Sequence, residues 1–197
     1  GANSAATLRS RPIRVLILDE VDAYVTNVEG EGSPISLAEE RTNTFENDKK
    51  IFKLSTPTGE GESVIWKEFE DTDRRYYHVP CPHCAGYQKL DFIQLTWDSG
   101  KPETVKLKCV HCSELIPERY KGKMLTAGTW IPDRPDKVSI FKRGYHLNSM
   151  YSAPGFLSWA TMVSKYEKAQ KFLKYGDDNL MRTFTNTMLG LPYAAAG

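Results

Sequence analysis

The chain has 197 residues, a length typical of one domain or two small ones. Its 40% hydrophobic content permits a buried core, and 26 Lys and Arg residues against 25 Asp and Glu residues leave a net charge of +1. This near-neutral balance does not predict a nucleic-acid partner. No apolar run approaches the roughly 20 residues of a membrane span, and no signal peptide is visible, so we expect no membrane partner.

Both ends of the sequence suggest a piece of a longer protein. The chain begins with Gly1 rather than Met and reaches a strand-like apolar run within about a dozen residues. It closes on Ala194-Ala195-Ala196-Gly197. We expect residues 194–197 to be appended sequence rather than part of the fold.

The first part of the chain reads as half of a parallel α/β sheet. Residues 15–18 form a continuous Val/Leu/Ile run, which is typical of a strand covered on both faces. The further elements expected here are a loop at 26–36, a helix at 36–47, a second strand at 50–55 and a helix at 63–69. Ser36 as N-cap and Glu39 three residues later fit a capping box for the first helix.

The pattern changes near Tyr76. Residues 88–92 and 105–109 alternate apolar and polar, which predicts small hairpins. A strand is expected at 145–150, and helices at 156–174 and 177–189. Trp159, Met162, Val163 and Tyr166 recur at helical spacing, so they form either ordinary core or an exposed docking stripe.

Asp19 and Glu20 directly follow the first strand and fit a Walker B motif. Strands of an α/β sheet deliver their last residues to the carboxyl edge, where ligands bind. Asp19 would hold Mg²⁺, and Glu20 would polarise the water that attacks the γ-phosphate of ATP. The plainer interpretation is a strand that ends in two solvated acids.

Ser55 and Thr56 end the second strand, about 35 residues downstream, which leaves room for one crossover helix. A small polar residue at this position could sense the γ-phosphate, although Thr-Pro and Thr-Gly pairs are also common in ordinary turns. The sequence holds no G-x-x-x-x-G-K-[ST] loop to cradle the phosphates. We therefore expect the isolated chain to bind ATP weakly and to hydrolyse none.

The four cysteines are arranged as two Cys-x-x-Cys pairs, Cys81 with Cys84 and Cys109 with Cys112. This spacing predicts a four-thiolate Zn²⁺ site, which is structural because no coordination position stays open. Redox thiols or a disulfide are the alternatives. Each Cys-x-x-Cys turn is called a knuckle. Gly86 is expected to supply a permissive backbone after the first knuckle. His83 and His111 are expected to point away from the metal.

The segment around the cysteines also has a basic side with nearby aromatic residues. Such a surface is either a strand-binding face for nucleic acid or a set of solvated lysines that block edge aggregation. The residues concerned are Lys106, Lys108, Arg119, Lys121 and Lys123, with Tyr87, Phe92, Trp97 and Tyr120.

Several blocks, in order, resemble the bacteriophage terminase large-subunit family, in its lambda-like branch. They are GANSAATLRSRP at 1–12, VLILDEVD at 15–22, STPT at 55–58, YHVPCPHC at 77–84 and TFTNTMLGLP at 183–192. The resemblance covers most of the chain. It implies an α/β fold, with a partial P-loop-type parallel sheet, a Cys₄ zinc-ribbon hairpin subdomain and C-terminal helices.

The resemblance also implies a domain plan and a set of roles. Residues 1–75 would be the second half of an ATPase core, 76–125 a zinc ribbon, and 126–193 a strand and helical linker toward a nuclease domain. Asp19 matches the magnesium-side acid, Glu20 the catalytic acid, and Ser55, Thr56 and Pro57 the coupling motif. Arg9 sits where relatives carry an arginine proposed to reach a neighbouring subunit's ATP, and Arg11 competes for that role; either could also be an ordinary surface arginine.

The activity implied is ATP-driven translocation of DNA into a procapsid. The implied partners are double-stranded DNA, the small terminase subunit, the procapsid portal and other copies of the large subunit in a ring, in the host cytoplasm. Two alternatives stay open from the residues alone. One is a zinc-ribbon module that binds nucleic acid or protein without an ATPase role, and the other is a different P-loop machine such as a helicase.

Overall fold

The computed structural model of the protein describes residues 11–194. The described residues form two compact units, which are treated separately below. The first comprises the residues up to Pro57 together with Ser63–Ile65, and the second comprises Thr58–Glu62 and the chain from Trp66 onward. The architecture is mixed α/β and includes the parallel pairing of two strands in the first unit, as the sequence predicts at that level of detail.

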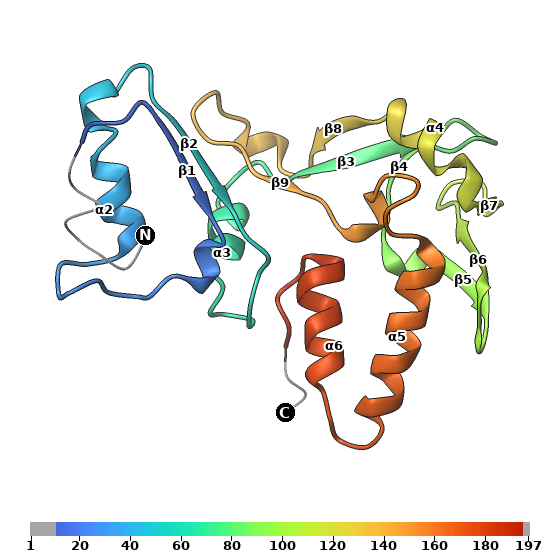
Figure 1. Ribbon diagram of the computed structural model, residues 1–197. Helices are drawn as coiled ribbons and strands as arrows, with labels where there is room; N and C mark the ends of the chain where they lie inside the picture. The colour runs from blue at the N-terminus through green and yellow to red at the C-terminus, as the bar shows by residue number, and fades with distance from the viewer. Residues whose placement is uncertain (1–10, 195–197) are drawn as a thin grey trace. The chain divides into compact units, whose positions relative to one another are not determined.

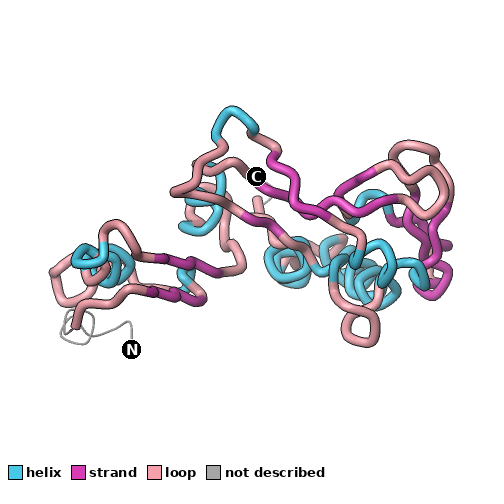
Figure 2. Tube along the Cα trace, turned by 90° about the horizontal axis from the view of Figure 1, so that it is seen from above, coloured by secondary structure: helices cyan, strands magenta, loops and turns pink. Residues whose placement is uncertain are grey.

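The first unit is built on two parallel strands, β1 (Val15–Asp19) and β2 (Lys50–Leu54). They lie side by side in both views (Figures 1 and 2) and pair in a register that sets Asp19 opposite Leu54. The connection between them carries helix α2 (Pro34–Glu40) and a 3₁₀ turn (Asn43–Phe45). Because the strands are parallel and in this register, their carboxyl ends meet at one edge of the sheet.

The expectation that this sheet is covered on both faces is wrong for the described residues. Leu16 and Leu18 are buried against Val21 and Ala38, whereas Ile17 is 64% exposed. Side chains alternate between the two faces of a strand. A single covering layer therefore buries only every second residue of the apolar run.

The helix expected at 36–47 is shorter and begins earlier. Ser33, not Ser36, is the N-cap of α2, and its hydroxyl oxygen accepts a hydrogen bond from the backbone N–H of Ile35, 3.3 Å away. Pro34 follows at the first helical position, where its fixed φ suits the helix and no N–H is needed. The α-helix ends at Glu40, and the Thr42 hydroxyl donates to the Glu39 carbonyl (2.7 Å), a local bond that favours a turn over further helix.

The second unit contains two sheets. The first joins β4 (Tyr87–Lys89), β3 (Arg75–Pro80) and β8 (Thr129–Pro132) in that antiparallel order, with the short β9 (Tyr145–His146) pairing in parallel with β3. The second sheet is antiparallel and consists of β5 (Leu95–Asp98), β6 (Lys101–Lys108) and β7 (Leu115–Pro117). The hairpin strands expected around 88–92 and 105–109 are confirmed in β4 and β6.

The helices of the second unit are short except for one. They are α4 (Lys121–Thr126), α5 (Trp159–Leu173) and α6 (Asn179–Thr183), which continues into a π-helical turn (Phe184–Leu189). Helix α3 (Val64–Glu70) starts in the first unit and ends in the second. None of the helices in the part of the chain described here is long and apolar enough to cross a membrane.

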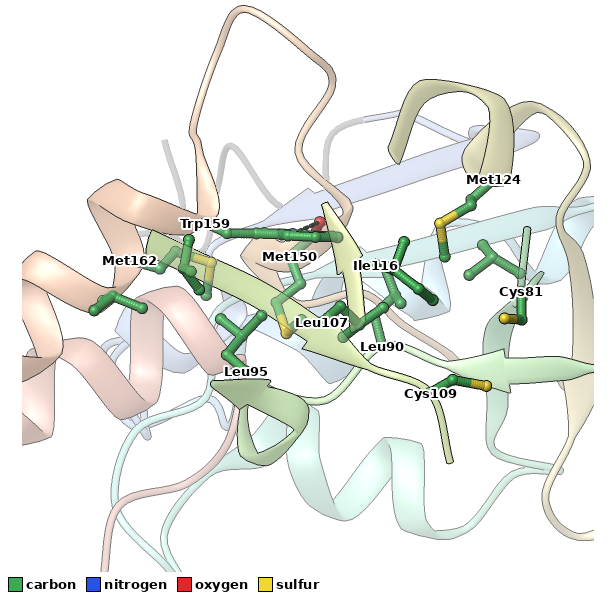
Figure 3. Packing of buried hydrophobic residues seen from close by; sticks show 13 residues of the cluster. Cys81, Leu90, Leu95, Leu107, Cys109, Ile116, Met124, Met150, Trp159 and Met162 are labelled. Carbon is green, nitrogen blue, oxygen red and sulfur yellow. Dashed lines mark hydrogen bonds between the residues drawn. The ribbon is translucent and has the colours of Figure 1, made fainter. Parts of the chain in front are cut away.

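The second unit has a core cluster to which α5 contributes Trp159, Met162 and Val163, and Figure 3 shows Trp159 and Met162 at the side opposite to Cys81 and Cys109. Trp159, Met162 and Val163 are fully buried, so these members of the helical stripe are core and the docking interpretation is wrong for them. The Trp159 indole also donates to the Met150 carbonyl, 3.1 Å away. Cys81 and Cys109 lie at one end of the same cluster.

Candidate functional site

The carboxyl edge of the β1–β2 sheet brings together four of the predicted site residues, Asp19, Glu20, Ser55 and Thr56. Asp19 ends β1, Glu20 follows it, and Ser55 follows Leu54, which pairs with Asp19. Asp19 and Glu20 are both exposed, and the Asp19 carboxylate accepts a hydrogen bond from the Glu20 backbone N–H at 3.1 Å. Two carboxylates and a hydroxyl at one exposed edge can bind a hydrated divalent cation and orient a water molecule.

Glu20 adopts a left-handed backbone conformation, with φ 55° and ψ 45°. This geometry costs a residue other than glycine on the order of 1 kcal/mol, and such conformations gather at functional sites. It ends β1 and starts a 3₁₀ turn (Val21–Ala23) that is anchored by the buried Val21. Glu20 therefore sits on a defined turn just beyond the strand rather than within it.

The Ser55 hydroxyl links the two strand ends. It donates to the Thr56 carbonyl at 2.9 Å and accepts from the backbone N–H of Asp22 at 3.2 Å. Its single proton is thus engaged within the chain in this state. Thr56 itself is exposed at the same edge, whereas Arg9, the candidate arginine finger, lies outside the described residues.

The second predicted site is the cysteine cluster, whose four Sγ atoms all lie within 4.8 Å of one another. Cys81 and Cys112 are 3.8 Å apart, and Cys84 and Cys109 are 3.9 Å apart, so the thiols are free and not disulfide-bonded. Sulfurs about 2.3 Å from a central ion in a tetrahedron are separated by about 3.8 Å. The cluster is therefore compatible with a tetrahedral metal ion.

The two knuckles repeat one hydrogen-bond pattern. In the first, the His83 N–H donates to the Cys81 sulfur at 3.4 Å and the Ala85 N–H to the Cys81 carbonyl at 2.9 Å. In the second, the His111 N–H donates to the Cys109 sulfur at 3.4 Å and the Ser113 N–H to the Cys109 carbonyl at 3.1 Å. Backbone N–H groups aimed at sulfur favour the thiolate, the form that binds metals.

The position that requires a left-handed backbone is not Gly86. Ala85 (φ 59°) and Ser113 (φ 63°) occupy equivalent places, one residue after the second cysteine of each knuckle. Gly86 is instead constrained by space, because a Cβ there would lie 2.6 Å from Cδ2 of His111. The His111 ring is held by a contact of 2.8 Å between its Nε2 and the Tyr87 carbonyl oxygen.

Four thiols this close cannot all ionise without a cation among them. Burial raises the pKa of Cys109, but N–H donors from Cys112 and His111 and the neighbouring thiols outweigh it and lower this pKa to about 6. The Glu114 N–H lowers the pKa of Cys112, while burial and the adjacent thiols raise it to about 12. A bound cation removes this conflict, because it stabilises all four thiolates together.

The basic, aromatic side expected near the cysteines is only partly a surface. Lys121 is 1% exposed, and Phe92 and Trp97 pack against the core and the Tyr166 ring. The other members that lie on the surface are Lys106, Lys108, Arg119, Lys123 and Tyr87, all of them exposed. Lys121 is therefore not part of a surface, and the partly buried Phe92 and Trp97 rings are less available for stacking on bases than exposed rings would be.

Sequence reasoning missed Asp22 as part of the sheet-edge site. Its backbone N–H reaches Ser55, and its carboxylate accepts a hydrogen bond of 2.7 Å from the N–H of Ile65. An acid two residues after Glu20 was the available signal. Its partner lies 43 residues away, however, and no local pattern identifies such a pair.

With this geometry, the chain is a mixed α/β protein that has an acidic sheet edge and a four-cysteine cluster. Residues 1–130 match the family model described as phage terminase large subunit gpA, ATPase domain. Residues 142–197 match the model described as terminase large subunit gpA, endonuclease domain. The chain belongs to the phage terminase large-subunit family.

Two curated relatives are similar over nearly the whole chain. The terminase large subunit of Enterobacteria phage P21 is 30% identical over 214 residues, covering 96% of this chain. The terminase large subunit of Escherichia phage lambda is 27% identical over 223 residues, covering 99%. The chain spans 32% of the length of each relative. No solved structure matches it.

Proposed function

We propose that the chain is a segment of the ATPase that drives DNA packaging in a tailed phage. The observation that carries this proposal is the parallel pairing of β1 with β2, which brings Asp19, Glu20 and Ser55 to one edge of the sheet. In a member of the terminase large-subunit family, this edge is the natural place for nucleotide chemistry.

Each residue at the edge has a distinct role in this proposal. Asp19 holds Mg²⁺ directly or through water, and Glu20 polarises the water that attacks the γ-phosphate. Ser55 and Thr56 sense the γ-phosphate, and Arg9 reaches the ATP of a neighbouring subunit as an arginine finger. The sequence holds no phosphate-binding loop, so ATP binding and turnover belong to the full-length subunit.

The cysteine cluster supports a structural Zn²⁺ ion held by Cys81, Cys84, Cys109 and Cys112. Its two ligand-bearing knuckles belong to the proposed ribbon at 76–125. Residues 1–75 are then the later part of the ATPase core, and residues 126–193 are a strand and helical linker toward the nuclease domain.

The proposed partners follow from the family. They are double-stranded DNA, the small terminase subunit, the procapsid portal and further copies of the large subunit in a ring, in the host cytoplasm. The near-neutral net charge of +1 and the buried Lys121 favour assigning the main DNA contact to other parts of the motor.

The decisive test is ATP hydrolysis by the full-length large subunit, comparing wild type with Glu20→Gln in the presence of DNA. We expect the amide variant to bind ATP and to lose turnover by about a hundredfold or more, the scale for removing a positioned base. Glu46→Gln is the matched control, because Glu46 is an exposed acid of the same unit away from the sheet edge. Unchanged turnover in Glu20→Gln would reject the catalytic assignment.

A further inference from the structure

The carboxylate of Asp22 connects the sheet edge to the first turn of α3. Its Oδ1 accepts the backbone N–H of Ile65 at 2.7 Å, within the first unit. Ile65 is the second residue of α3. The first N–H groups of a helix have no partner inside the helix, so Asp22 caps α3 from a distant part of the chain.

The backbone of the same residue contacts Ser55. The Asp22 N–H donates to the Ser55 hydroxyl oxygen at 3.2 Å, and that hydroxyl donates to the Thr56 carbonyl. Asp22 also lies in the 3₁₀ turn that begins after Glu20. Asp22 therefore contacts three features of the site. It lies in the turn that carries Glu20, its N–H meets the Ser55 hydroxyl, and its carboxylate caps the start of α3.

Buried apolar side chains flank this link. Val21, its neighbour, is 1% exposed, and Ile65 packs against the cluster formed by Leu16, Leu18, Val21 and Ala38. Glu20, by contrast, is exposed and in a left-handed conformation that must be held from outside. The Asp22–Ile65 hydrogen bond is a contact in the described unit that can hold it.

We infer that Asp22 is a positioning residue for nucleotide hydrolysis, which clamps the Glu20 turn and Ser55 through its cap on α3. This inference rests on the proposed ATPase function. It assigns Asp22 no contact with Mg²⁺ or with phosphate. The clamp depends on the acceptor oxygen of Asp22 that meets the Ile65 N–H.

Two substitutions separate the acceptor from the charge. Asp22→Asn keeps an oxygen at the position of Oδ1 without the charge, whereas Asp22→Glu keeps the charge but displaces the acceptor by one methylene. In the full-length large subunit, we expect Asp22→Asn to hydrolyse ATP at nearly the wild-type rate. We expect Asp22→Glu to lower kcat by about tenfold to a hundredfold, the scale of a small misplacement of catalytic groups, and to leave the KM for ATP unchanged.

Asp22→Ala, which adds no bulk, should show the same loss and replaces the Glu variant if that variant does not fold. Asp48→Asn is the control, because Asp48 is an exposed acid of the same unit that pairs with Arg14. Amide exchange across residues 63–67 of the 197-residue chain gives a readout independent of turnover. Amide hydrogens of this segment should exchange faster in the Asp22→Glu and Asp22→Ala variants and at the wild-type rate in Asp22→Asn.

The outcomes are distinguishable from failure of the proposed function. If Glu20→Gln keeps full turnover, the proposed catalytic role of Glu20 fails, and with it the turn that Asp22 is inferred to position. If Glu20→Gln is inactive and all Asp22 variants behave as wild type, only the positioning role is rejected. Loss of turnover in Asn with retention in Glu would also reject it, because the charge and not the acceptor would then be needed.

Discussion

The ammonium group of Lys121 lies 2.6 Å from the carboxylate of Glu118, although the Lys121 side chain is only 2% exposed. The same carboxylate accepts the backbone N–H of Trp159, the first residue of α5, at 2.9 Å. Lys121 in turn donates to the Leu157 carbonyl at 3.1 Å. This group of contacts joins a segment matched by the ATPase-domain model to a helix matched by the endonuclease-domain model.

The pair should respond asymmetrically to mutation. Glu118→Gln leaves the buried Lys121 ammonium without its carboxylate and should cost about 3 kcal/mol of unfolding free energy, the lower end for breaking a buried pair. Lys121→Met should cost about 1 kcal/mol, because Glu118 keeps the Trp159 N–H and is 27% exposed to water. Denaturant unfolding measures both values, and equal costs would contradict this account.

An exposed ion pair in the same unit is the control. Arg134 and Asp136 are 3.3 Å apart, with side chains 35% and 66% exposed. Because water screens such pairs, Arg134→Gln should change the unfolding free energy by less than about 1 kcal/mol.

Metal removal should unfold the second unit. Cys81 and Cys109 are part of its core cluster, so loss of the ion leaves mutually repelling thiolates or partly protonated thiols beside buried apolar groups. We expect one zinc ion per chain in protein purified without chelator, and a large drop in melting temperature once a strong chelator is added. Metal content by mass spectrometry and thermal melts test this.

Variants within the first knuckle sharpen the metal test. Cys81→Ser should abolish zinc binding, whereas His83→Gln should leave it intact, because the His83 ring faces Tyr120 with centroids 6.2 Å apart. Zinc retained in Cys81→Ser, or lost in His83→Gln, would show that the ligand set is wrong.

Adjacent residues of the first knuckle should respond in opposite directions to small changes. Ala85→Gly removes a Cβ from a left-handed residue and should stabilise the chain by about 1 kcal/mol. Gly86→Ala places a Cβ 2.6 Å from the His111 ring and should destabilise it, because the ring is held by the Tyr87 carbonyl. Thermal melts of both zinc-loaded variants decide the matter, and a stabilised Gly86→Ala would refute the steric account.

The sequence predicted what depends on local pattern. The β1 and β2 strands follow from short β-branched and apolar runs, and the cysteine cluster from its spacing, because both signals lie within a few residues. The one-sided cover of Ile17, the burial of Lys121 and the Asp22–Ile65 hydrogen bond depend on segments far apart in the chain. The cap at Ser33 was missed although it is local, because the spacing of Ser36 and Glu39 fits a capping box, whereas the structure begins the helix at Pro34.

The half-buried His146 should make stability depend on pH. Its ring lies among Trp66, Phe69 and Tyr76, and this burial lowers the pKa of His146 below its ordinary value of 6.5, against a smaller opposing effect of the Gly190 carbonyl. The unfolded chain therefore binds a proton below pH 6.5 that the folded chain does not. The stabilisation is complete above pH 6.5 and is lost as the pH falls from there toward the folded-state pKa.

The measurement is the unfolding free energy of wild type and His146→Gln between pH 8 and pH 5, on the order of the range in which imidazole titrates. Gln keeps a donor for the Gly190 carbonyl, which the His146 Nε2 meets at 3.0 Å. The difference between the two curves should change below pH 6.5 by at most about 1.4 kcal/mol per pH unit, the limit for one proton. Zinc release affects both proteins alike and cancels in this difference. Parallel curves would show that His146 titrates normally in the fold.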